Sequence, residues 1–432
     1  MARSKTDLAI WRDSGFRCLW IGTILSALGD SSLFIILAWF VIDVTGSEGA
    51  LGTALLCMSL PRLVFMLLGG AVADRIERKI ILVSSVLARS MILSGFSLFL
   101  WLKTDVPPPF LIYGMACMFG IVDAFFWPAR SSITPLIVDK KQLAAANSML
   151  EGSQQASMII GPLFASLLLH LSTYALMFLA VATAFFVSLL FLTRLRPVTN
   201  HAAHDSKSPI RRDVIEGIRY VSHIRIILII FMISTLINLM FSGPLNIGLP
   251  SLIKRLGWEG STYGYLEGAV GAGAIAGAAV VWLAKGLRGR FRLISLFLGL
   301  MGIAVAALGM MKSVGFGLTM MFITGMTISL VDLPIITYIQ TITAPRMLGR
   351  VMSLLSMSSL GLTPVGYVTA AFLLQHGLVT SRGMLLLGGA IMGIFGLATI
   401  LLPSFRRMEE HPKWQQAGHG GAANAKEKEL AQ

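Results

Sequence analysis

Long apolar runs alternate with short polar joints from Phe16 to Pro403. The hydrocarbon core of a bilayer is about 30 Å thick, and roughly 20 consecutive apolar residues of helix cross it. Runs of that length predict about twelve spans, so we expect an all-α, polytopic membrane protein. The predicted spans are residues 16–42, 50–73, 80–102, 109–127 or on to 137, 148–170, 174–193, 226–249, 261–284, 293–311, 316–340, 351–375 and 382–402.

A single long internal polar joint divides these spans into two equal sets, which favours a duplicated transporter with its substrate site near the midplane. The back of that joint, Arg211 to Arg225, predicts an amphipathic helix on the inner leaflet. The polar tail cannot bury enough apolar surface to fold. We therefore predict an N-terminal six-helix half at 1–193, a cytosolic loop at 194–225, a C-terminal six-helix half at 226–403 and a disordered cytosolic tail at 404–432.

The basic residues are distributed unevenly between the two sides of the predicted membrane. With the N-terminus in the cytosol, nearly all of them fall on the cytosolic side, as the positive-inside rule expects. Both termini are then cytosolic, in a plasma (inner) membrane. This explains the net charge of +14, and without a soluble basic module no nucleic-acid partner is expected. The bases on the opposite side are Lys103, Lys254, Arg255, Lys312 and Arg382.

Several other function classes lack their sequence signatures. Cys18, Cys57 and Cys117 lie in or beside apolar runs without metal-ligand spacing, so no metal site, cofactor or disulfide framework is predicted. The chain has no GxxxxGK[ST] loop for ATP, and neither HExxH nor GxSxG for an enzyme. A membrane enzyme is therefore disfavoured, as is a sensor, because no soluble signalling domain accompanies the spans.

Five charged residues within predicted spans need an explanation: Asp30, Arg62, Arg89, Asp123 and Asp332. A charge at mid-bilayer costs roughly 2.5–3.5 kcal/mol on insertion scales, so each needs a partner, a cavity or a function. At about 1.5 Å per residue, Asp30 and Arg62 lie ~16 Å from their span ends and Arg89 lies ~14 Å. Asp30 can therefore pair with either arginine. The pair is either a fixed bridge or, as we favour, one that opens when Asp30 takes a proton or Arg62 meets an anionic substrate, which would couple ion movement to transport.

Asp123 and Asp332 occupy corresponding places in the two predicted halves, nearer the cytosolic side. They are candidates for paired gate or cavity positions, or for bonds to neighbouring helices beside prolines. Glu151 and Glu267 lie near span ends and favour interfacial positions. Three uncharged residues could either line the cavity or bond between helices: Gln154, Gln155 and Asn238.

The eighth predicted span is rich in glycine and alanine. Gly268, Gly271, Gly273 and Gly277 give it a smooth face. Small residues let helices approach closely in lipid, so we expect another helix to pack on this face.

The joint after the second span reads Gly70-Ala-Val-Ala-Asp74-Arg75-Ile-Glu-Arg78-Lys79. It resembles the signature loop of the major facilitator superfamily. The resemblance implies that Asp74 faces the start of the eleventh span, near Arg350, where the partial positive charge of a helix N-terminus stabilises one conformation. The basic residues of the loop also help to set the orientation of the chain in the membrane.

Further stretches resemble the branch of this superfamily that contains macrolide-type drug exporters and the enterobactin exporter. They are S-A-L-G-D at 26–30, W-P-A-R at 127–130, L-A-A-A-N at 143–147 and L-G-R-V at 348–351. The resemblance implies a monomeric secondary transporter that exports an amphipathic small molecule, a drug or a siderophore, against inward proton flow by alternating access. A lipid or lysolipid translocator is the alternative. The expected partners are the substrate, protons and membrane lipids.

Overall fold

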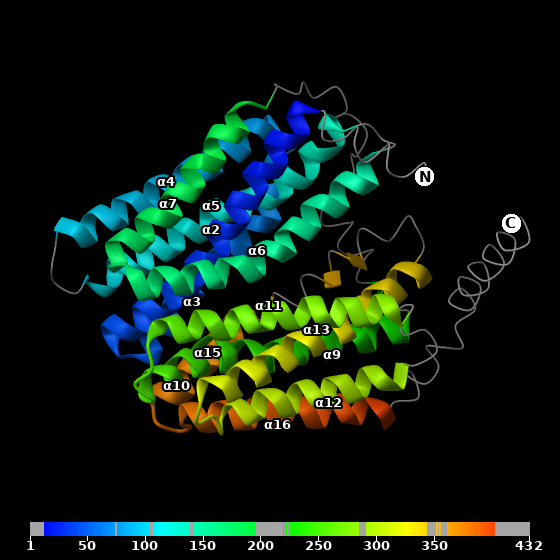
Figure 1. Cartoon of the computed structure of the whole chain (residues 1–432). Coiled ribbons are helices and arrows are strands. Elements are labelled where there is room, and N and C mark those ends of the chain that lie inside the picture. Colours follow the sequence, from blue (N-terminus) through cyan, green and yellow to red (C-terminus); the bar gives the residue numbers. More distant parts are fainter. Residues whose placement is uncertain are drawn as a thin grey trace, which may run out of the picture. The chain divides into compact units, whose positions relative to one another are not determined.

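The computed structural model describes residues 13–73, 76–102, 107–138, 142–195, 219, 221–222, 224–284, 291–343, 351–352, 354–355 and 361–401. Every regular element in these ranges is a helix (Figure 1). Ten of the described helical segments are long and apolar enough to cross a membrane. The prediction of an all-α, polytopic membrane protein is confirmed.

The helices of the first half begin and end close to the predicted spans. Asp13 starts the first of them, because its carboxylate accepts a hydrogen bond from the Gly15 amide at 2.7 Å. Gly46, at φ 64°, ends the same helix in a left-handed conformation that glycine adopts without strain. The elements are α2 (Ser14–Thr45), α3 (Glu48–Ala73), α4 (Arg78–Leu102), α5 (Pro109–Ile137), α6 (Leu143–Leu171) and α7 (Tyr174–Thr193).

The second half contains one irregularity that the sequence analysis did not predict. The seventh span continues to Arg255 rather than ending near 249, and it passes through a π-helical segment that begins at Pro244. Proline has no amide hydrogen to donate, so a wider turn is accommodated there. The elements are α9 (Arg225–Gly243), η1 (Pro244–Gly248), α10 (Leu249–Arg255), α11 (Gly260–Leu283), α12 (Phe291–Leu308), α13 (Val314–Ile342), α15 (Thr363–Gln375), α16 (Ser381–Ala398) and η4 (Thr399–Leu401).

Some predicted segments lie wholly or partly outside the described residues. The eleventh span is described at 351–352, 354–355 and α15. Most of the predicted amphipathic helix at 211–225 and the whole of the predicted tail at 404–432 fall outside. The tail and the amphipathic helix therefore stay predictions.

Packing groups the chain into two compact units. Unit 1 comprises Met1–Ser206, Asn246–Gly271 and Tyr367–Leu378, and unit 2 comprises Lys207–Leu245, Ala272–Gly366 and Val379–Gln432. Residues 246–271 and 367–378 thus pack with the first six helices. The half boundaries predicted from the sequence stay a prediction.

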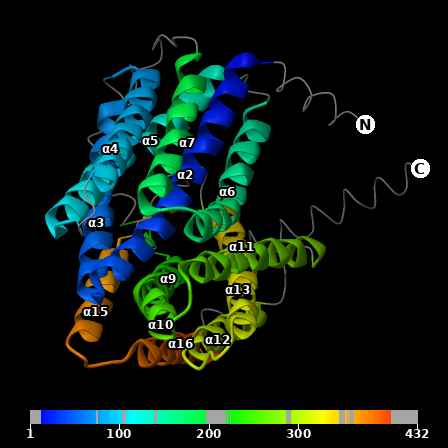
Figure 2. The same ribbon diagram turned by 60° about the vertical axis from the view of Figure 1, so that its left-hand side comes forward.

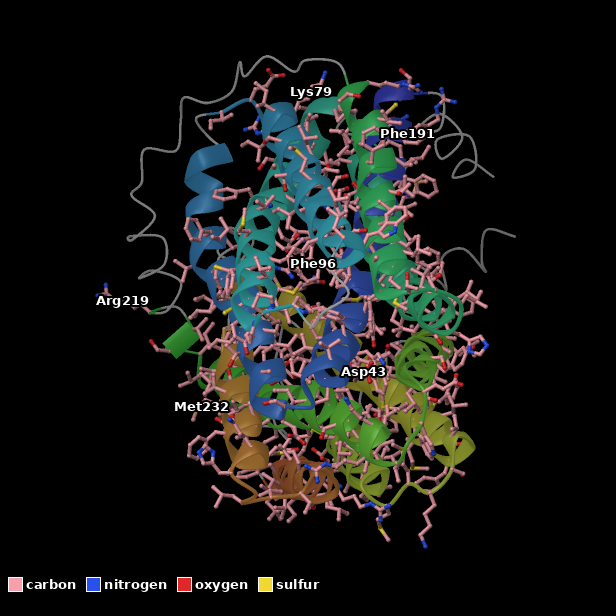
Figure 3. The ribbon with its side chains drawn as sticks, turned by 90° about the vertical axis from the view of Figure 1, so that its left-hand side faces the viewer. Asp43, Lys79, Phe96, Phe191, Arg219 and Met232 are labelled. Carbon is pink, nitrogen blue, oxygen red and sulfur yellow. The ribbon has the colours of Figure 1, made fainter. Side chains whose placement is uncertain are left out.

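Unit 1 is a bundle in which α3 packs on α5, α4 packs on α5 and α7, and α2 packs on α6 and α7 (Figure 1). Lys79 lies toward one end of this bundle and Asp43 toward the other (Figure 3). Phe40, Phe96 and Phe178 form an edge-to-face cluster with ring centroids 5.0 to 5.9 Å apart. Such pairs add favourable quadrupole contacts to apolar burial.

Unit 2 is built around α12 and α16, which lie side by side, with α13 also packed on α12 (Figure 2). Gly302, Gly389 and Gly393 bring the backbones of α12 and α16 into direct contact. In lipid, this close approach replaces the hydrophobic force that drives helices together in water.

The glycine face of α11 packs on two different helices. Gly264, Gly268 and Gly271 lie against α6, within unit 1. Gly273 and Gly277 lie against α13, within unit 2. A Cβ atom at any of these positions would collide with the helix opposite, so each contact depends on glycine.

We predict that Gly120→Ala destabilises unit 1, whereas Gly114→Ala on the same helix does not. A Cβ atom at Gly120 would collide with the Met58 backbone carbonyl of α3, while one at Gly114 would meet no atom within 4 Å. Overpacking of this kind costs about 1–3 kcal/mol. Thermal unfolding of the purified protein should show a lower Tm for Gly120→Ala alone, and equal Tm values would contradict the described α3–α5 contact.

Candidate functional site

Four charged side chains meet at the middle of unit 1. Asp30, Arg62, Arg89 and Asp123 come from α2, α3, α4 and α5, each near the midpoint of its helix. The sequence analysis placed Asp123 nearer the cytosolic side. In the structure α5 has the longer of its two predicted extents, to Ile137, and Asp123 stands midway between its ends.

Arg89 is the centre of this charge cluster. Its Nη1 donates to Asp30 Oδ1 at 2.9 Å and Oδ2 at 3.2 Å, and to Asp123 Oδ1 at 3.1 Å. Of the two partners that the sequence allowed for Asp30, the structure brings Arg89 to it. Charge-assisted hydrogen bonds of this length are roughly twice as strong as neutral ones.

Arg62 pairs with Asp123 instead. Its Nε lies 2.9 Å from Asp123 Oδ2, so Asp123 is held by two guanidinium groups and Asp30 by one. The four charges sum to zero, which offsets the cost of placing each in an apolar bundle. Exposure is unequal across the cluster: Arg89 is 0% exposed, Asp123 2%, Asp30 19% and Arg62 40%.

Aromatic rings enclose the remaining faces of the Arg89 guanidinium. Its Cζ lies 4.5 Å from the ring centroid of Phe126 and 4.9 Å from that of Phe185. Arg89 Nε and Nη2 have no hydrogen-bond partner among the described residues. Cation–π attraction to the rings partly replaces the missing bonds, so the head group is fixed in place.

A second polar group lies in the part of α11 that belongs to unit 1. Tyr263 is fully buried, and its hydroxyl has no hydrogen-bond partner within the described ranges. Glu267 interacts electrostatically with the hydroxyls of Tyr263 and Tyr367, and Arg62 interacts with Tyr367. The sequence analysis favoured an interfacial Glu267. The structure instead half-buries it seven residues inside α11.

Arg130 has a role that the sequence analysis did not assign. Its Nη2 lies 2.6 Å from Glu151 Oε1, which ties α5 to α6, and its Cζ lies 4.7 Å from the Trp127 ring. Trp127 and Arg130 are three residues apart, the spacing that stacks side chains on one helix face. That spacing is the feature of the sequence from which the contact between Trp127 and Arg130 could have been predicted.

The other predicted residues lie elsewhere. On α6, Gln154 is half-buried and Gln155 is exposed. In the signature loop, Arg78 and Lys79 begin α4 and Gly70 lies in α3. Asp74, Arg75 and Arg350 fall outside the described residues.

Unit 2 contains a cavity of about 300 Å³ between α9, α12 and α13. Asp332 and Asn238 both line it, together with Ser234 and a predominantly apolar wall. The Asn238 side-chain amide donates to the Ser234 carbonyl at 2.9 Å. The structure therefore brings two of the predicted polar residues to one cavity, in the unit that does not contain Arg89.

The family model for the major facilitator superfamily matches residues 19–364. The chain belongs to the major facilitator superfamily. Members of this superfamily are transporters, and the chain is accordingly a multi-pass membrane transporter and not an enzyme. The expectation drawn from the signature loop and the four shorter stretches is confirmed at the level of the family.

Relatives of this superfamily member include named exporters. Macrolide efflux protein A of Streptococcus pyogenes is 23% identical over 91% of this chain and 97% of its own length. Enterobactin exporter EntS of Escherichia coli O1:K1 / APEC is 24% identical over 78% of this chain and 80% of its own. Among solved structures, the nucleoside transporter NupG has a TM-score of 0.68 at 12% identity, covering 92% of this chain and 99% of its own. That likeness shows the fold alone.

We predict that Arg89→Gln destabilises the protein far more than Arg62→Gln. Removing Arg89 leaves Asp30 without its partner in an apolar bundle, which costs about 3–5 kcal/mol. Arg62 is partly exposed and Asp123 retains Arg89, so its removal costs about 1 kcal/mol. Thermal unfolding of the purified variants measures both effects. Equal losses in Tm would contradict the central position of Arg89.

Proposed function

We propose that this superfamily member exports an amphipathic small molecule by alternating access, driven by protons moving inward. The observation that carries the proposal is the charge cluster of Asp30, Arg62, Arg89 and Asp123. An ionisable group at mid-bilayer is a functional-site hypothesis by default, and here four of them share one network. The names of the exporter relatives support the outward direction.

Asp30 is the proton-accepting group in this proposal. Asp123 is bound by two arginines and almost fully buried, whereas Asp30 has one arginine and a partly exposed carboxylate. A proton arriving at Asp30 neutralises it and releases one of the two acids held by Arg89. Arg89 remains bonded to Asp123, so the cluster changes its net charge by one without losing its core.

Outward opening requires the parting of a second set of contacts within unit 1. Lys254 Nζ donates to the backbone carbonyls of Ile42 at 2.7 Å and Asp43 at 2.5 Å, at the negative end of the α2 dipole. Arg255 Nη2 lies 2.8 Å from Glu48 Oε1 at the start of α3. We call these contacts of α10 with α2 and α3 the α10 latch.

The α10 latch lies on the predicted non-cytosolic side. It uses two of the few bases that the sequence places there, and Asp43 lies at the end of unit 1 away from Lys79 (Figure 3). In the proposal, the chain is a monomer of the plasma (inner) membrane with both termini in the cytosol. Substrate leaves once α10 separates from α2 and α3.

We predict that Asp30→Asn reaches the membrane but loses proton-driven transport. Asparagine keeps the size of the side chain and cannot take up a proton. Inverted vesicles that contain the protein would be given a panel of amphipathic compounds, and substrates would be identified by proton release from the acidified lumen. The variant should show no substrate-induced proton release and should keep substrate counterflow, which needs no net proton movement.

Asp30→Glu is the matched control, since it restores a carboxylate and should recover part of the proton release. Proton release by Asp30→Asn at the wild-type rate would remove Asp30 from the coupling role. Loss of counterflow together with proton release would indicate a structural defect instead.

We predict that Arg255→Glu opens the α10 latch and that the double variant Arg255→Glu with Glu48→Arg, which swaps the two charges, closes it again. Leu252 on α10 is buried, so a cysteine there is protected while the latch is closed. In a background without the three native cysteines, Leu252→Cys should react several-fold faster with an impermeant maleimide in the Arg255→Glu variant. The charge-swapped pair should return to the slow rate. Unchanged reactivity in Arg255→Glu would show that this ion pair does not hold α10.

A further inference from the structure

The cavity of unit 2 is formed by matching faces of helices. On α9 the lining residues recur from Ile230 to Phe241 at steps of three and four, and on α13 from Ile328 to Ile336 in the same way. This spacing places them on one stripe of each helix. Leu298 and Met301 of α12, together with Leu355, complete the wall. The result is an apolar chamber within a single packing unit.

Among the residues that the structure describes, Asp332 is the only charged one that lines this chamber. It lies ten residues before the end of α13 at Ile342, about 15 Å along the helix axis, and so at depth in the span. No described lysine, arginine or histidine forms an ion pair with it. The negative charge is therefore uncompensated within the described part of the chain.

This setting contrasts with that of the two acids in the charge cluster of unit 1. Asp30 and Asp123 are each bonded to at least one arginine in unit 1. An uncompensated carboxylate in apolar surroundings attracts a positive charge and repels an anion. The chamber around it accepts apolar groups, and the uncharged polar residues Asn238 and Ser234 also line it.

We infer that this chamber binds a hydrophobic monocation, with the protonated or quaternary nitrogen against Asp332 and the apolar body against α9 and α12. The volume of about 300 Å³ is at the small end of ligand pockets, so it holds a compact cation or the amine-bearing part of a larger compound. Phe241 adds an aromatic face that favours a cation. The inference names the substrate class of the exporter and rests on the proposed function for its physiological meaning.

Equilibrium binding to the purified, full-length protein tests the chamber without any transport. Ethidium serves as a fluorescent hydrophobic monocation, and N-phenyl-1-naphthylamine as a neutral aromatic probe. Asp332→Asn should weaken ethidium binding by roughly tenfold or more, because a charge-assisted contact is lost, and should leave the neutral probe unaffected. Asp332→Glu, which keeps the charge, should restore most of the ethidium affinity.

A second variant tests the location independently of the charge. Ile237→Trp fills the chamber from α9 and should weaken both probes while Asp332 remains present. Ethidium binding that is unchanged in both Asp332→Asn and Ile237→Trp would overturn the inference. Equal weakening of both probes by Asp332→Asn would also overturn it, since the carboxylate would then not select for a cation.

The outcome separates this inference from the proposed function. Ethidium binding that depends on Asp332, in a protein whose panel compounds release no protons from vesicles, would uphold the chamber and refute proton-driven export. Proton-driven export that is lost in Asp30→Asn, together with ethidium binding that is unchanged in Asp332→Asn, would uphold the proposed function and refute the chamber. Glu151→Gln is the matched control for binding, because it removes a largely exposed acid from unit 1 and should leave ethidium affinity unchanged.

Discussion

The cost of a charge in an apolar helix bundle governs the interior of unit 1. Arg89 is fully buried and keeps a permanent charge, so two carboxylates and two aromatic rings converge on it from three other helices, α2, α5 and α7. Once Arg89 is placed, Asp30 and Asp123 must reach it, and Arg62 must neutralise the second acid. The rotation of α2, α3, α4 and α5 about their own axes follows from that requirement.

Unit 2 meets the same cost in a different way. Among the residues that the structure describes, no base pairs with Asp332, and its carboxylate lines a cavity of molecular size. A balanced network is suited to changing its charge by a single proton, because its core bonds survive the change. An unbalanced acid beside a cavity is suited to accepting a positive group from outside. The aspartates at corresponding sequence positions therefore differ in their surroundings: Asp123 is bound by two arginines, whereas Asp332 lines the cavity.

Much of this arrangement was predictable from the sequence. The length and apolar character of each run predicted the helices, because the bilayer sets one length for all of them. The depth of each charged residue could also be estimated by counting residues from the end of its span. This estimate correctly limited the partners of Asp30 to Arg62 and Arg89. Depth could not choose between them, since the choice depends on how each helix is rotated and packed. The position of Asp123 along its helix depends on where α5 ends. The sequence allowed an end at 127 or at 137, and apolar and small residues continue the helix through Pro128 to Ile137. The cavity around Asp332 could not be predicted, because it is a space between α9, α12 and α13 that no single run encodes.

The glycine face of α11 bears on how this polypeptide can be divided. Its first turns cover α6 with Gly264, Gly268 and Gly271, and Ser166 of α6 donates a hydrogen bond to the Ser261 carbonyl at 2.6 Å. A fragment that ended after α7 would contain six complete spans. It would still lack the first turns of α11, which pack on α6. The folding unit of the first half is therefore discontinuous in sequence. During synthesis, the first turns of α11 are made well after α6, since Ser166 and Ser261 are 95 residues apart in the sequence. The contact between α6 and α11 therefore forms late.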